Sequence, residues 1–297
     1  MVMVEQSEMV GDRVRLTPAR VTTGQNIMRR AASMARGDRV LSVGHELRAI
    51  ELGLLAEVGR TNVKVIPRPR LAVLSTGNEL VPPEEAPGAG HIRNSNSPML
   101  VAAARAAGAT SFDLGIARDQ PEVLRAMMAA GLEADVLVIS GGVSAGVLDL
   151  VPGVLESLGV EPVFHKVRLK PGKPLWFGVL AAEGGDKLVF GLPGNPVSSL
   201  VGFELFVRPA IAKLAGRSHA ADETTATLAN EFAHRGDRPT YHPAELRFEG
   251  GQAVVEPLRW KGSGDLRTLA GANALACFPA GDERHAAGET IRVLRLH

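Results

Sequence analysis

The stretch Asp135-Val-Leu-Val-Ile-Ser-Gly-Gly-Val-Ser-Ala-Gly146 decides the fold of this chain. Its first part is a short apolar run rich in β-branched residues, which is typical of a strand buried on both faces. A glycine-rich loop follows directly, and residues 149–158 then have a helical pattern. A strand, a loop and a helix in this order form the unit from which parallel sheets are built. The sequence therefore predicts an α/β domain around residue 140.

The same alternation extends on both sides of this stretch. We expect strands at 70–74, 110–116, 135–139 and 187–190, and helices near 98–107, 121–130, 149–158 and 196–215. Two further strands, at 162–168 and 175–179, flank the loop Lys170-Pro-Gly-Lys-Pro174 as an excursion. Residues 67–217 are thus predicted to form a central, mostly parallel sheet flanked by helices.

The regions outside the α/β domain have different patterns. Residues 1–66 contain short strand-like runs at 13–16 and 39–43 and a helical run at 49–56, and they are interpreted as a partial, β-rich N-terminal domain. Residues 218–297 contain short alternating runs such as 253–257 and 290–296, which favour a small β barrel. We therefore predict three regions in all.

Composition excludes several classes of protein. Lys and Arg (33) nearly balance Asp and Glu (32), so no charge excess favours nucleic acid or an anionic membrane as a partner. Cys277 is the single cysteine, which excludes an internal disulfide and a cysteine-rich metal site and is most simply a buried thiol. The N-terminal residues resemble no signal peptide and no long apolar segment follows, so a cytoplasmic protein is expected.

Acidic side chains and glycine loops follow the predicted strands at one edge of the sheet. Glu79 follows the first strand, Asp119 the second, and the loop beginning at Gly141 the third, with Asp149 just beyond it. The segment Leu192-Pro-Gly-Asn-Pro196 follows the fourth strand. In open α/β sheets, ligands bind at the carboxyl ends of the strands. The sequence therefore predicts an active site at this edge.

The three acids suggest a metal site. Glu79, Asp119 and Asp149 would repel one another unless a cation lay among them, and hard oxygen ligands favour Mg²⁺. Each acid taken singly also has an ordinary structural interpretation, since Asp149 would cap its helix and the other two would be solvated loop acids.

Basic residues and backbone amides would bind an anion beside the metal. Lys166, Lys170 and Lys173 lie in and around the proline-rich loop, where they would act as point charges for phosphate or a molybdate-like oxyanion. Ser144 lacks the surroundings of a nucleophilic serine, so we expect it to bind ligand by hydrogen bonding. The glycine loops match neither a dinucleotide-binding fingerprint nor a P-loop, and no histidine is assigned a role.

Six motifs in order resemble those of the molybdopterin molybdotransferases, the group that includes the E domain of gephyrin. They are Ser75-Thr-Gly-Asn-Glu-Leu80, Ile92-Arg-Asn-Ser-Asn96, Gly115-Ile-Ala-Arg-Asp119, Ser140-Gly-Gly-Val-Ser-Ala-Gly146 with Asp149, Lys170-Pro-Gly-Lys-Pro174 and Gly191-Leu-Pro-Gly-Asn-Pro-Val-Ser198. The resemblance implies insertion of molybdenum from molybdate into adenylylated molybdopterin, with Mg²⁺ and with release of AMP. It also implies a homodimer.

The resemblance implies roles for individual residues. Glu79, Asp119 and Asp149 would be metal ligands, and with Lys166 and Lys170 they would form the catalytic set. The residues that it implies for binding the pterin and its phosphate are Gly141, Gly142, Val143, Ser144, Lys173, Pro193, Gly194, Asn195 and Ser263.

Departures from the family pattern keep other functions open. The family begins with a further domain, and the resemblance here starts at Val2. Ser33 and Val147 stand where acids are usual, and Asn94 where an aspartate is usual. The alternatives are a non-catalytic protein that binds molybdopterin during cofactor assembly, and a related pterin adenylyltransferase or nucleotide hydrolase. The proline-rich loop and the C-terminal β region favour the transferase over the adenylyltransferase.

Overall fold

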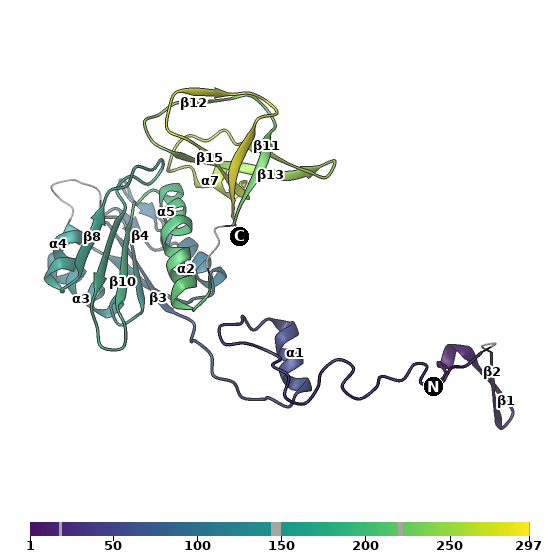
Figure 1. The fold of residues 1–297 in the computed structure, drawn as a ribbon. Helices are drawn as coiled ribbons and strands as arrows, with labels where there is room; N and C mark the ends of the chain where they lie inside the picture. Colours follow the sequence, from purple (N-terminus) through teal and green to yellow (C-terminus); the bar gives the residue numbers. More distant parts are fainter. Residues whose placement is uncertain (18–19, 144–149, 219–221, 297) are drawn as a thin grey trace. The chain divides into compact units, whose positions relative to one another are not determined.

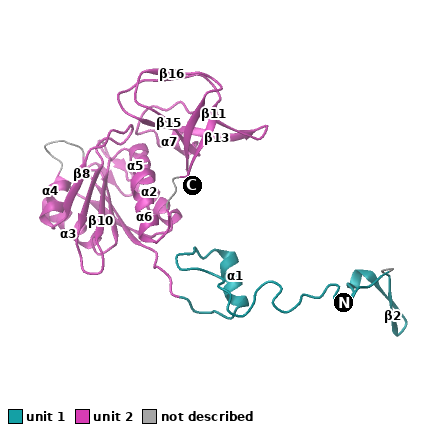
Figure 2. Cartoon of the chain, viewed as in Figure 1, with its two compact units in different colours: residues 1–63 teal, residues 64–297 magenta. Residues whose placement is uncertain are grey.

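The computed structural model describes residues 1–17, 20–143, 150–218 and 222–296 and divides into two compact units. One unit comprises Met1–Val63 and the other Lys64–His297 (Figure 2). The larger unit contains both the predicted α/β region and the predicted C-terminal β region. Each unit is described by itself below.

The smaller unit has few regular elements. A short 3₁₀ helix, η1 (Val4–Gln6), leads into an antiparallel hairpin of β1 (Ser7–Val10) and β2 (Arg13–Leu16), and α1 spans Ala49–Glu57. The strand predicted at 39–43 is wrong, because no strand forms there. Hydrogen-bonded turns flank this run at 35–38 and 42–45, and no strand among the described residues pairs with it.

A six-stranded sheet organises the larger unit (Figure 1). Its strands, in spatial order, are β6 (Thr110–Ala117), β3 (Arg70–Thr76), β7 (Val136–Ser140), β10 (Lys187–Leu192), β9 (Trp176–Leu180) and β8 (Glu161–His165). The first four are parallel, whereas β9 and β8 run antiparallel to their neighbours, because the loops at 181–186 and 166–175 turn the chain back along the adjacent strand. The prediction of a central, mostly parallel sheet is confirmed.

Helices cover both faces of this sheet, as its alternating side chains require. On one face, α3 (Pro121–Gly131) and α4 (Leu150–Ser157) pack on side chains such as Leu74 and Ile139. On the other, α2 (Asn96–Ala106) and the long helical segment that follows β10 pack on Leu71 and Val138 (Figure 1). Two-sided burial explains why these strands are apolar throughout.

The helix predicted at 196–215 forms, but it is not uniform. It consists of α5 (Pro196–Gly202), a π-helical turn η2 (Phe203–Val207) and α6 (Arg208–Leu214). Pro209 lies near the start of α6 and has no N–H group to donate to the preceding turn. The wider turn just before the proline accommodates this missing donor.

The C-terminal region is a closed barrel, as the sequence predicts. Its strands, in spatial order, are β11 (Glu223–Leu228), β14 (Gln252–Pro257), β13 (Thr240–Glu249), β15 (Ala274–Phe278) and β17 (Thr290–Arg295). The remaining elements are the pair β12 (Phe232–His234) and β16 (Glu283–His285), the helix α7 (Leu266–Ala270), and the short strands β4 (Leu80–Val81) and β5 (Ile92–Arg93) of the α/β region.

An apolar cluster joins the barrel to the α/β layers. Val197 and Val201 of α5 belong to the same buried group as Leu269, Leu275 and Leu294 of the barrel. Their burial explains why the sheet and the barrel form one compact unit. Within the described ranges, no helix is both long and apolar enough to cross a membrane.

Candidate functional site

The loops after β3 and β6 are bonded to each other, and they carry two of the predicted acids. The Arg118 guanidinium donates to the carbonyl oxygens of Asn78 (2.8 Å) and Leu80 (3.0 Å). The Asp119 backbone N–H donates to Asn78 Oδ1 at 3.1 Å. Glu79 and Asp119 are therefore carried on adjoining loops, with exposed side chains. Among the described residues, neither carboxylate forms an ion pair.

The glycine loop after β7 packs tightly against neighbouring strand ends. The Gly141 N–H donates to Leu192 O at 2.9 Å. Gly141 has φ +96°, and a Cβ there would lie 2.6 Å from Thr76 O; a Cβ on Gly142 would lie 2.6 Å from Val151 Cγ2. Neither residue has room for a side chain. Internal packing thus already explains these two glycines, without any ligand.

Gly194 differs from Gly141 and Gly142 because it has room for a side chain. The nearest atom to a Cβ at Gly194 is Gly141 Cα at 3.8 Å, and its φ is not positive. Its carbonyl accepts a hydrogen bond from Asn96 Nδ2 at 2.7 Å, and the same nitrogen donates to Ser140 Oγ at 2.8 Å. Asn96 therefore ties the loop after β10 to the end of β7. Since the fold leaves space at exposed Gly194, a ligand can approach the backbone there.

A buried polar cluster joins the end of β3 to the start of α2. Ser75 Oγ donates to Asn94 Oδ1 at 3.1 Å, and Asn94 Nδ2 donates to Ser97 Oγ at 3.0 Å. All three side chains are buried. Asn94, which departs from the family pattern, thus has its hydrogen-bonding groups occupied within the fold.

The barrel contributes directly to the loop after β10. Asn195 Nδ2 donates to Ser263 Oγ at 2.9 Å, and Val197 N–H donates to Ser263 O at 3.0 Å. The residues predicted at Asn195 and Ser263 are therefore brought together. The neighbouring Pro193 is buried, and its carbonyl accepts a hydrogen bond from the Ser199 hydroxyl.

The proline-rich loop is also attached to the barrel. Lys170 N–H donates to Pro239 O at 2.9 Å, and Tyr241 N–H donates to Lys170 O at 2.8 Å. The Lys170 ammonium donates to Arg235 O at 3.2 Å. Lys166 and Lys173 lie on the same excursion with exposed side chains. In the described part of the chain, no hydrogen bond or ion pair links these lysines to Glu79 or Asp119.

Val143 lies at the far end of the glycine loop and faces inward. Its side chain is 1% exposed, and its carbonyl accepts a hydrogen bond from His165 Nε2 at 3.1 Å. That contact joins the loop after β7 to the end of β8. Because the side chain is buried, the ligand contact that the sequence predicts at Val143 would have to use its backbone.

Two predicted residues, Ser144 and Asp149, lie outside the described residues. Across residues 1–17, 20–143, 150–218 and 222–296, no three His, Cys, Asp or Glu side chains are close enough to hold a metal ion. Because Asp149 is not among these residues, the metal set of Glu79, Asp119 and Asp149 stays a prediction.

Sequence reasoning missed the residues that hold the site together. Arg118 and Asn96 belong to motifs that the sequence singled out, but neither was assigned a role. His165 and Arg235 act through a ring nitrogen and a backbone carbonyl. For Arg118 the usable signal was a long polar side chain just after a predicted strand, and for Asn96 it was an amide side chain just before a predicted helix. Nothing in the sequence marks the carbonyl of Arg235.

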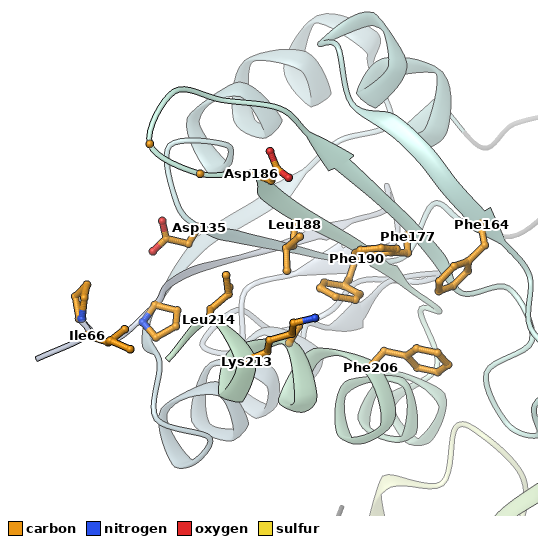
Figure 3. A pocket seen from close by; sticks show the side chains of 15 residues that line it. Ile66, Asp135, Phe164, Phe177, Asp186, Leu188, Phe190, Phe206, Lys213 and Leu214 are labelled. Carbon is orange, nitrogen blue, oxygen red and sulfur yellow. The ribbon is translucent and has the colours of Figure 1, made fainter. Parts of the chain in front are cut away.

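A large apolar pocket lies elsewhere on the α/β region (Figure 3). Its volume is about 820 Å³. Phe177, Phe190 and Leu188 line it from the sheet, and Phe206 and Leu214 from the helical segment (Figure 3). It extends to the amino end of β10, whereas the predicted site lies at the carboxyl ends of the strands. Pocket size alone would therefore have indicated a different location.

Two parts of the chain match described families. Residues 72–213 match a probable molybdopterin binding domain, and residues 225–296 match the MoeA C-terminal region, domain IV. The first region contains the sheet and its helices, and the second contains most of the barrel.

Similar proteins cover most of the chain. Molybdopterin molybdenumtransferase from Bacillus subtilis is 33% identical over 93% of this chain, and that from Staphylococcus aureus strain MRSA252 is 32% identical over 91%. The chain spans 64% of the length of each of these relatives. A solved molybdopterin biosynthesis MoeA protein from Pyrococcus horikoshii superposes with a TM-score of 0.77 at 32% identity, covering 98% of this chain and 70% of that one.

Proposed function

Because this chain belongs to the molybdopterin molybdenumtransferase (MoeA) family, we propose that it inserts molybdenum from molybdate into adenylylated molybdopterin and releases AMP. The substrates are thus a pterin carrying a phosphoanhydride and an inorganic oxyanion. The activity is proposed for these 297 residues, which span 64% of the length of the Bacillus subtilis relative.

One observation carries the proposal: the candidate site is built jointly by the α/β region and the barrel. The loop after β10 is bonded to the barrel through Asn195 and Ser263, and the proline-rich loop through Lys170. Each of these contacts involves a residue that the family resemblance implies. Two of the loops that are proposed to bind the ligand are therefore held by the barrel.

The acidic loops fit Mg²⁺ by their chemistry. Glu79 and Asp119 present exposed carboxylates on loops that Arg118 and Asn78 hold together. Hard oxygen ligands of this kind suit Mg²⁺, which binds through one or two carboxylates and through phosphate oxygens. When bound, Mg²⁺ would neutralise charge on the phosphates and polarise the bond to be broken.

The remaining residues would bind and orient the anions. The ammonium groups of Lys166, Lys170 and Lys173 would offset the charge of phosphate or molybdate, and the exposed backbone at Gly194 would approach the pterin or its phosphate. Asn195 and Ser263 would fix this loop through their mutual hydrogen bond, while the Asn195 amide oxygen and the Ser263 hydroxyl proton would contact the pterin or its phosphate. Asp149 and Ser144 keep the roles that the resemblance implies.

The test is AMP release from adenylylated molybdopterin by the purified 297-residue chain, with and without molybdate and Mg²⁺. The proposal predicts release that requires both. Release without molybdate would indicate a hydrolase instead. Pterin binding without any release would indicate the non-catalytic assembly function. Glu79→Gln is the companion variant, since it removes one carboxylate charge from an exposed loop and leaves the core intact.

Two further expectations accompany the proposal. A homodimer and a cytoplasmic location are implied by the resemblance. The dimer is checked by light scattering coupled to size-exclusion chromatography, where a mass near twice the 31.3 kDa of one chain is expected.

A further inference from the structure

The loop that follows β12, at residues 235–236, contacts the Lys170 side chain and holds its ammonium group. Arg235 provides the carbonyl oxygen that accepts from the ammonium at 3.2 Å. Gly236 follows, with φ +153°, and a Cβ on it would lie 3.6 Å from Lys170 Nζ. Gly236 N–H donates to Asp282 Oδ1 at 3.1 Å, and Gly281 N–H donates to Gly236 O at 2.8 Å. The position of the ammonium is therefore set by a loop that two hydrogen bonds tie to residues 281–282.

A buried histidine lies on the same side of Gly236. The Cβ position at Gly236 that faces Lys170 Nζ is also 3.9 Å from His234 Cε1. The His234 side chain is 4% exposed and stacks on the Phe278 ring, with centroids 5.8 Å apart. Its Nε2 atom is buried and has no hydrogen-bond partner within the described part of the chain. The fold thus packs the His234 ring against Phe278 but leaves its Nε2 atom without a partner, close to the lysine.

We propose that His234 is a positioning residue for Lys170. The buried His234 imidazole supports the loop that holds the Lys170 ammonium, and it couples anion binding at Lys170 to the uptake of a proton. This inference rests on the proposed function, in which Lys170 binds an oxyanion of the substrates. It assigns His234 no contact with the substrate.

The charges around His234 give the direction of this coupling. Burial lowers the pKa of His234, and the nearby Lys170 and His285 lower it further, while Asp282 and Glu283 oppose them. His242 also interacts electrostatically with His234, and the pKa of His242 is itself lowered mainly by burial. Burial and the neighbouring positive charges therefore favour the neutral form of His234 in the absence of an anion. An anion on Lys170 offsets the lysine charge, so the pKa of His234 rises when the anion binds.

Reciprocity then fixes the effect of pH on binding. If an anion raises the affinity of His234 for a proton, protonation of His234 raises the affinity of the site for the anion by the same factor. Anion affinity should consequently increase as the pH falls through the titration of His234. A histidine that served only to pack the loop would produce no such linkage.

The first measurement is the NMR titration of the His234 imidazole in the full chain. Lys170→Met removes the neighbouring charge and should raise the pKa of His234. Lys213→Met is the matched control, since Lys213 is an exposed lysine on α6, and it should leave that pKa unchanged. Sulfate, whose charge is constant across this pH range, should raise the pKa of His234 in the wild type but not in Lys170→Met.

The second measurement is sulfate affinity by calorimetry at two pH values, one below and one above the His234 titration that NMR records in the wild type. Wild type should bind severalfold more tightly at the lower pH, and His234→Gln should lose this difference while still binding. An unchanged His234 titration in Lys170→Met, or a pH dependence retained in His234→Gln, would overturn the inference. If both measurements come out as expected but no AMP is released, the proposed function fails and the positioning role of His234 stands.

Discussion

Replacing Gly141 by alanine tests the packing of the glycine loop against the end of β3. Two separate costs arise at this position. The backbone has φ +96°, which an L side chain rarely adopts, and the new Cβ would lie 2.6 Å from Thr76 O. Both the carbonyl and the loop backbone must move to relieve that contact, because β3 is paired on both sides. The substitution should therefore destabilise the larger unit markedly.

Gly115 provides a matched control for the magnitude. Its φ is +90°, but a Cβ there would meet no atom within 4 Å. The left-handed conformation costs a non-glycine residue about 1–2 kcal/mol, which applies to both positions. Overpacking in a closed site adds about 1–3 kcal/mol, which applies to Gly141 alone. Gly141→Ala should then lower the free energy of unfolding by about 1–3 kcal/mol more than Gly115→Ala does.

Urea denaturation of the two variants, followed by circular dichroism, measures this difference. The midpoint should fall further for Gly141→Ala, with slopes equal to that of the wild type. Equal losses of unfolding free energy in the two variants would refute the steric argument. Ligand approach would then be the remaining reason for a glycine at position 141.

Three other predictions concern the barrel and its contact with the α/β region. Burial raises the pKa of the Cys277 thiol to about 11, so native protein at pH 8 should react with a thiol reagent far more slowly than unfolded protein; comparable rates would contradict its burial. Burial lowers the pKa of His242, so below the ordinary histidine pKa the unfolded chain binds more protons than the folded one. Tm should accordingly fall as the pH drops below about 6.5, and His242→Gln should show a smaller fall in this range. Ser263→Ala removes the hydroxyl that accepts from Asn195 and should cost about 0.5–1.5 kcal/mol in unfolding free energy while weakening AMP release; full activity would show that the barrel contact is dispensable.

The order and type of the elements in the larger unit followed from local pattern. Apolar runs such as 135–139 needed no tertiary information, since a strand buried on both faces is apolar at every position. The carboxyl ends of parallel strands share one edge of the sheet, so the loops that carry Glu79 and Asp119 could also be placed from the sequence. The expectation for 39–43 failed because pairing between strands is not a local property, and that run has no partner.

The glycines show how the same residue type carries different meanings. The family resemblance implies the same ligand-binding role for Gly141, Gly142 and Gly194. Tertiary packing separates Gly141 and Gly142, which have no room for a side chain, from Gly194, which has room. The distinction depends on atoms of Thr76 and Val151, which belong to other elements of the fold, and no local pattern encodes such distances.

By itself, the sequence determined the α/β sheet, the C-terminal barrel and the edge at which the predicted site lies, because periodicity and the order of strands and loops are properties of neighbouring residues. Only the tertiary structure decided which side chains hold that edge together. Arg118 bridges two loops, Asn96 joins the loop after β10 to the end of β7, and Asn195 binds Ser263 of the barrel. These contacts bring together residues from distant parts of the chain, and their energies depend on distances that exist only after the sheet and the barrel have packed against each other.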